Sequence, residues 1–106
     1  MSQPADPGGT FTVLTTYSPD EFGGIAALAA RALEYARTAQ SRHEGFLGFR
    51  VFTAEDGASL VTLADWVSRD AFEAFRVSDE GRDLVAEAVV HHPKIVFLIS
   101  RGGVTT

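Results

Sequence analysis

Hydrophobic and polar positions along this chain follow two periodicities, which together predict a sheet covered by helices. Residues 11–17 (FTVLTTY) are rich in β-branched and aromatic side chains, which predicts a first strand. Residues 18–39 follow a helical period, with Arg31, Glu34 and Arg37 opposite an apolar face. That face comprises Ile25, Leu28, Ala29, Ala32, Leu33, Tyr35, Ala36 and Ala39. Because alanine dominates it, the helix either approaches the sheet closely or leaves a cavity beneath.

The start of this helix and the next element have local signals. Ser18 is a capping residue, Pro19 suits the first helical position, and Glu21 completes a capping box. A long β-hairpin is predicted over residues 46–67, with residues 55–57 (EDG) as its turn, because Asp-Gly favours positive φ angles. Both faces of the hairpin are apolar, so each face of the sheet requires a cover.

The second half of the chain completes a common topology. Ser68 is predicted to cap a short helix, and Ser78 or Asp79 starts a further helical segment that ends before Pro93. Residues 95–99 (IVFLI) form a closing strand. The order β-α-β-β-α-β predicts an α+β, ferredoxin-like antiparallel sheet. Its last strand lies at a sheet edge, where two bare apolar faces promote aggregation. We therefore predict a homodimer whose sheets pack face to face.

Composition and charge narrow the functional classes. The chain has 106 residues, 45% of them hydrophobic, which suits one domain at residues 10–101 with flexible tails at 1–9 and 102–106. The net charge of −5, with scattered Lys and Arg, disfavours binding to nucleic acid or anionic membranes. The lack of cysteine excludes disulfides, thiol nucleophiles and Cys-ligated zinc. Without a signal peptide or a spanning segment of roughly 18 apolar residues, we expect a cytoplasmic protein.

The second arm of the hairpin indicates where a site lies. Alternation places Leu60, Thr62, Ala64 and Trp66 on one face. If this face lies under the helices, the small Thr62 and Ala64 leave room for an aromatic ligand, with Trp66 and Phe72 at its edge. The alternative is that the aromatic side chains fill an ordinary core.

Arg50 is a candidate for binding an oxyanion. By alternation it shares a strand face with Phe46 and Phe52, and its guanidinium stays charged at any working pH. If that face turns inward, Arg50 enters the pocket. The alternative is an ion pair at the rim of the dimer.

The histidines offer a second candidate. His91 lies one helical turn after Glu87, and this contact would tune a general base near neutral pH. Equally, a histidine in the last turn complements the helix dipole. Adjacent His91 and His92 diverge by about 100°, and His43 is expected in solvent, so no metal site is predicted.

Two segments carry a family resemblance. Residues 44–52 (EGFLGFRVF) and 60–75 (LVTLADWVSRDAFEAF), set between the opening and closing strands, resemble the antibiotic biosynthesis monooxygenase family over roughly residues 10–101. The resemblance implies a dimeric α+β barrel that oxidises a phenolic aromatic polyketide to a quinone with O₂ and no flavin, haem or metal. In the implied mechanism a stabilised phenolate or carbanion reduces O₂ itself, while the pocket excludes water and holds the developing charge.

The resemblance also implies site residues. Trp66 stands at the family's pocket tryptophan, whereas Thr62 replaces an asparagine and Phe72 replaces a tyrosine. The family's basic residue falls near Val85 or Ala86, and the position of the iron-ligating histidine in haem-degrading relatives is apolar too. The candidate catalytic residues are therefore Trp66, Thr62, Arg50 and His91. The candidate pocket wall comprises Phe72, Phe75, Ala64, Leu84 and Ala88.

The resulting hypothesis is a cofactor-independent monooxygenase of natural-product biosynthesis, acting on an aromatic or polyketide-like molecule with O₂. Two alternatives remain open. One is a non-catalytic small-molecule binder or auxiliary dimer. The other is a cyclase or isomerase on the same scaffold, which needs only an acid or a base.

Overall fold

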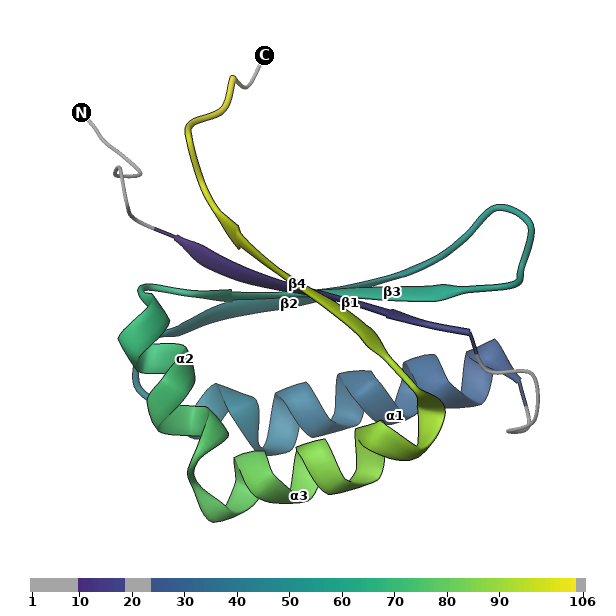
Figure 1. The fold of residues 1–106 in the computed structure, drawn as a ribbon, viewed down its shortest axis with the longest axis horizontal. Helices are drawn as coiled ribbons and strands as arrows, with labels where there is room; N and C mark the ends of the chain where they lie inside the picture. The colour runs from purple at the N-terminus through teal and green to yellow at the C-terminus, as the bar shows by residue number, and fades with distance from the viewer. Residues whose placement is uncertain (1–9, 19–23, 105–106) are drawn as a thin grey trace.

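The computed structural model describes residues 10–18 and 24–104, which form a four-stranded antiparallel sheet with three helices on one face (Figure 1). The strands are β1 (Phe11–Tyr17), β2 (Phe46–Thr53), β3 (Leu60–Trp66) and β4 (Lys94–Ile99). The helices are α1 (Ile25–Thr38), α2 (Arg69–Arg76) and α3 (Asp79–Ala88), with short 3₁₀ turns η1 (Gln40–Arg42) and η2 (Val89–His91). The sheet order β2-β3-β1-β4 confirms the ferredoxin-like α+β prediction.

The two central strands show which face of the sheet the helices cover. In β3 every second side chain is buried, namely Leu60, Thr62, Ala64 and Trp66. β1 pairs with β3 so that Thr15 lies opposite Thr62 and shares its face. The alternation is as predicted, and the structure places this face under the helices, which the sequence left as a condition.

Strand β2 departs from simple alternation because it carries a bulge at Leu47. Phe46 pairs with Trp66, but Gly48 pairs with the next residue, Asp65, so one extra residue shifts the register. Arg50 consequently pairs with Leu63 on the face away from the helices. The interpretation that Arg50 shares a face with Phe46 is therefore wrong.

The start of helix α1 is described from Gly24 onward. Residues 19–21 of the predicted capping segment, which spans residues 18–21, lie outside the described residues. The helix begins at Ile25, after Gly24 at φ 98°, and no side chain caps it. Ala36 is buried and Leu28 and Ala32 are half-buried, as the helical pattern predicts. Leu33, predicted on the same face, is instead 40% exposed.

The two C-terminal helices begin at predicted caps. The Ser68 hydroxyl accepts a hydrogen bond from the Ala71 amide, and Ser78 accepts one from Gly81, each at 3.1 Å. After α3 and η2 the chain turns at His92, which has a left-handed backbone, and enters β4. No helix in residues 10–18 and 24–104 is long and apolar enough to cross a membrane.

Strand β4 lies at the sheet edge, as predicted, and every one of its side chains is exposed. By register, Ile95, Phe97 and Ile99 share the helix side with β1 residues such as Val13, while Val96 and Leu98 point to the outer face. Phe97 is 46% exposed although it contacts Phe11 and Phe72. Residues 101–104 follow without regular secondary structure. The predicted tail at residues 1–9 lies outside the described chain.

Candidate functional site

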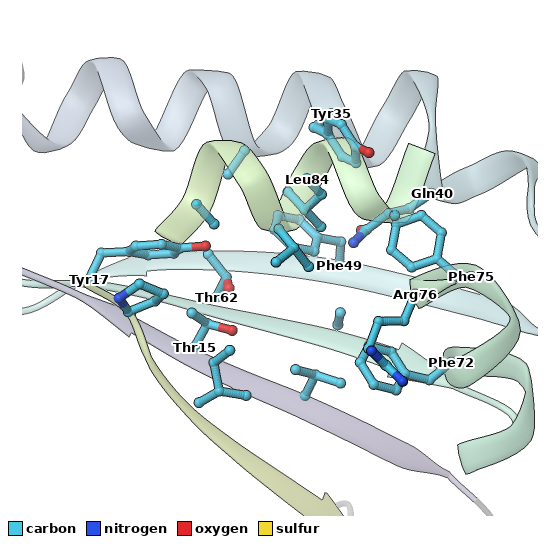
Figure 2. Close-up of a pocket in the computed structure, with 18 of the residues that line it drawn as sticks. Thr15, Tyr17, Tyr35, Gln40, Phe49, Thr62, Phe72, Phe75, Arg76 and Leu84 are labelled. Atoms are coloured by element: carbon cyan, nitrogen blue, oxygen red, sulfur yellow. The ribbon is translucent and has the colours of Figure 1, made fainter. Parts of the chain in front are cut away.

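A cavity of about 430 Å³ lies between the sheet and the helices α1 and α3 (Figure 2). Small side chains on the facing elements leave this space open. Thr62 and Ala64 of β3 form its floor, and Ala32 of α1 and Ala88 of α3 form part of its roof. The cavity therefore follows from a sheet and helices whose facing positions both carry short side chains.

The aromatic side chains of the hairpin and α2 make one end of the cavity. Trp66 is fully buried, and its ring stacks on Phe75 with centroids 5.3 Å apart. Phe72 meets Trp66 at 6.1 Å, edge to face. All three line the cavity, so Trp66 belongs both to the core and to the pocket wall. Its indole Nε1–H is buried with no hydrogen-bond partner, which is uncommon for a buried tryptophan.

Gln40 is a wall residue that the sequence analysis missed. It lies in η1 directly after α1 and is only 6% exposed. Figure 2 shows its side chain at the aromatic end, near Phe75. Its Oε1 atom is buried without a hydrogen-bond partner. Its position four residues after Ala36, on the buried stripe of α1, was the available signal.

Three hydroxyl groups gather at the other end of the cavity (Figure 2). They belong to Thr15, Thr62 and Tyr17, all from the central strands. Burial raises the pKa of Tyr17, and the nearby carboxylate of Glu87 raises it further. The tyrosine therefore remains a neutral hydrogen-bonding group at ordinary pH.

Tyr35 connects α1 to α3 across the top of the cavity. Its hydroxyl donates a hydrogen bond to the Glu80 carbonyl oxygen. Burial, reinforced by the carboxylates of Glu80, Asp83 and Glu87, raises the pKa of Tyr35 to about 12.

Arg76 is a cation at the α2 end of the cavity wall. Its Nε donates a hydrogen bond to Glu73 Oε1 at 2.7 Å. Neither Tyr35 nor Arg76 was singled out from the sequence.

The structure separates the two adjacent histidines. His92 lines the cavity, whereas His91 lines a smaller hollow of about 40 Å³ beside it. The His91 ring meets Tyr17 edge to face at 6.2 Å. Glu87, the predicted partner of His91, accepts a 2.9 Å hydrogen bond from Nη2 of Arg31, and His91 also acts on its carboxylate electrostatically. That bond is the main cause that lowers the pKa of Glu87.

Two further polar residues lie away from the cavity. Arg50 projects from the outer face, with its guanidinium 5.7 Å from the Phe52 ring centre, and is not part of the cavity lining formed by the described residues. His43 is not solvated as predicted. Its side chain is 22% exposed, its Nε2 lies 2.6 Å from Glu80 Oε1, and its ring packs edge-on against Phe75. It therefore joins the loop before β2 to α3.

The remaining predicted pocket residues do line the cavity, namely Leu84 and Ala88 of α3. Val85, one of the two positions near which the family resemblance implies a basic residue, also lines it and is apolar. Within residues 10–18 and 24–104, no group of three or more His, Asp or Glu side chains is placed to hold a metal ion. The arrangement is thus an apolar, aromatic pocket with a few neutral hydrogen-bonding groups, one arginine (Arg76) and one histidine (His92).

The fold and the pocket define a ferredoxin-like domain that encloses an apolar cavity between its sheet and its helices. The sequence profile of the antibiotic biosynthesis monooxygenase family matches residues 10–87. The chain belongs to this family. A comparison with curated protein sequences gives no match.

Solved structures share the fold. The chain is similar to SnoaB, a cofactor-independent oxygenase from Streptomyces nogalater, with a TM-score of 0.76, 15% identity, and coverage of 92% of this chain and 99% of that one. A monooxygenase from the gene ActVA-Orf6 of Streptomyces coelicolor, solved with nanaomycin D, gives a TM-score of 0.68, 25% identity, and coverage of 95% and 96%. A dimeric ferredoxin-like protein of unknown function from Jannaschia sp. CCS1 gives a TM-score of 0.72 and 15% identity. The match covers 87% of this chain and 100% of that one.

Proposed function

We propose that this protein is a cofactor-independent monooxygenase that oxidises an aromatic, polyketide-like substrate with O₂ in natural-product biosynthesis. The observation that carries the proposal is the cavity of about 430 Å³ with its aromatic wall. Its volume falls in the range of about 300–1,000 Å³ that is usual for small-molecule sites. The likeness to an oxygenase that works without a cofactor and to a monooxygenase solved with nanaomycin D supports this substrate class.

The pocket suits a substrate that is flat and apolar with oxygen atoms on its rim. Phe72, Phe75 and Trp66 offer ring faces and edges against which an aromatic substrate packs. Thr15 and Thr62 offer hydroxyl groups to phenolic or carbonyl oxygens at the opposite end. Because the wall is mostly apolar, a bound aromatic substrate would displace water, and these few hydrogen bonds would then stabilise a developing phenolate more strongly.

The reaction balances without any other oxidant. A CH₂ carbon activated by a phenolic ring system and one O₂ molecule give one carbonyl group and one water molecule. The carbon is oxidised, one oxygen atom enters the product, and the other is reduced to water. The protein binds the substrate anion, orients it and moves protons.

The second part of the proposal is a homodimer that covers the outer face of the sheet. By register, Val96, Leu14, Leu63 and Arg50 form one row across all four strands on that face. Phe52 and Leu98, on the same face, are also exposed in the single chain. A second copy would bury this apolar surface, and the dimeric relative from Jannaschia supports the assembly.

Aerobic turnover tests the enzymatic proposal. Purified protein is mixed with a panel of anthrone-type phenols, and oxygen uptake and quinone absorbance are followed. Ala64→Leu places a larger side chain on the cavity floor and is expected to lower turnover at least tenfold. Ala74→Leu, on the exposed side of α2, is the matched control and should keep full activity. No oxygen uptake with any substrate would contradict the proposal.

A non-catalytic binder is the second candidate, favoured by the apolar side chains of Phe72 and Val85, at or near which the family resemblance implies polar ones. The fluorescence of Trp66, the only tryptophan, separates the candidates. Quenching by a phenol together with quinone formation supports the enzyme. Quenching without conversion supports the binder.

A further inference from the structure

His92 has an unusual backbone conformation at the edge of the cavity. With φ 51° and ψ 57°, it is the only non-glycine residue with positive φ among residues 10–18 and 24–104. It also precedes Pro93, and a residue before proline ordinarily adopts an extended backbone. Strained conformations of this kind concentrate where a side chain has a functional position to hold.

This conformation places the imidazole where it reaches both cavity and solvent. The His92 amide donates a 3.1 Å hydrogen bond to the Val89 carbonyl, which closes the turn after η2. Its side chain lines the cavity, yet the residue as a whole is exposed. His92 therefore lies at the mouth, where a proton taken from a bound molecule can pass to water.

The other titratable groups of the wall cannot accept a proton near neutral pH. Within the described chain, four such side chains line the cavity: Tyr17, Tyr35, Arg76 and His92. The pKa of Tyr17 is raised by burial, and that of Tyr35 is raised to about 12, so both stay protonated. A guanidinium stays charged at any working pH. No Asp or Glu is part of the wall formed by the described residues.

We propose that His92 is the general base of the oxidation, an inference that rests on the proposed function. An imidazole nitrogen of His92 takes the proton of the acidic C–H or O–H bond of the substrate. The resulting anion gives electrons to O₂, a C–O bond forms, and the proton returns from the imidazolium to give a hydroperoxide. His92 then takes the second C–H proton as the O–O bond breaks, and the departing hydroxide recovers it as water. Histidine returns to its neutral form.

Charged and titratable groups on the surrounding elements will influence this base. They are Tyr17 on β1, Glu87 on α3, His91 beside it and Lys94 on β4. Glu87 is hydrogen-bonded to Arg31 of α1, so its carboxylate is already engaged. If His92 is the base, the loss of kcat/KM at low pH must disappear when His92 is replaced, and must persist when only a neighbouring group is replaced.

Two variants remove the imidazole without opposing the backbone. In His92→Gly the new residue has no Cβ to oppose a left-handed conformation. In His92→Asn the new residue is asparagine, one of the residues that adopt this conformation most readily. Both variants are expected to unfold at or above the wild-type temperature. The added phenol should quench their Trp66 fluorescence with the same affinity as in the wild type. Both are expected to lower kcat about 100-fold or more, the usual contribution of a general base. The fall of kcat/KM at low pH that the wild type shows (the acidic limb of its pH profile) should be absent in both variants.

Chemical rescue distinguishes a proton acceptor from a residue that only supports the fold. Because His92 is exposed, added imidazole should restore turnover in His92→Gly, and the restored rate should follow the concentration of free imidazole base. His91→Gln tests the neighbouring ring. Loss of the acidic limb in that variant, with His92→Gly and His92→Asn fully active, would overturn the inference. Absence of turnover in the wild type would instead contradict the proposed function.

Discussion

Thr15 of β1 lies directly opposite Thr62 of β3, and both residues are buried on the helix side of the sheet. This pair forms the polar part of the cavity floor. We predict that Thr15→Val or Thr62→Val weakens phenol binding about five- to tenfold, because each removes one hydrogen-bonding group while keeping the shape. Fluorescence titration measures the change. Thr16→Val, on the other face of β1, is the control, and equal losses in all three variants would contradict the prediction.

Gly81 marks the closest approach between α2 and α3. A Cβ at this position would lie 2.0 Å from the Phe75 carbonyl oxygen and 2.8 Å from the Arg76 Cα, both rigid backbone atoms. We expect Gly81→Ala to lower the free energy of unfolding by about 2–3 kcal/mol. Denaturant unfolding measures this loss. Gly48→Ala, where a Cβ meets no atom within 4 Å, should change it by less than about 1 kcal/mol.

Tyr35 predicts how stability responds to alkaline pH. Its pKa rises from an ordinary value of 10.0 to about 12 on folding, so between these values the unfolded chain binds fewer protons than the folded one. Its contribution to stability is therefore complete below pH 10 and is lost as pH rises towards 12. Tyr35→Phe should unfold with a shallower dependence over this interval. An unchanged slope in thermal unfolding curves would contradict the prediction.

The apolar row on the outer face predicts the effect of a charge there. Val96→Lys places a cation on this face, beside Leu14 in the sheet register, and should shift the protein from dimer to monomer at micromolar concentration. Analytical ultracentrifugation measures the shift. Val104→Lys adds the same charge at a residue that is 93% exposed and outside the sheet, and should leave the dimer intact. A wild-type protein that sediments as a monomer would contradict the assembly.

Local signals explain why most of the fold was predictable. The caps at Ser68 and Ser78, the turn at Gly57 and the alternation of β3 each depend on side chains within a few residues of one another. The bulge at Leu47 has no such signal, because it arises from the pairing of β2 with β3. One extra residue there reversed the predicted face of Arg50.

The candidate site divides in the same way. Thr62, Ala64 and Trp66 were named from alternation along one strand, and the structure places all three in the cavity wall. Tyr17 and His92 were not named as site residues. They reach the cavity from β1 and from the turn after η2, which the alternation along β3 does not describe. Their roles in binding and catalysis remain predictions.

By itself, the sequence determined the order of elements, the alternation of side chains along β3 and the small side chains that face each other between β3 and α1. These features depend on periodicity and capping, which act over one or two turns of chain. Only the tertiary structure decided which polar groups meet in that space. A bulge sent Arg50 outward, and a left-handed turn brought His92 rather than His91 to the cavity. The bulge depends on the pairing of β2 with β3, which no local pattern specifies, whereas the turn at His92 is closed by a hydrogen bond to Val89 and is placed against the sheet by the tertiary fold.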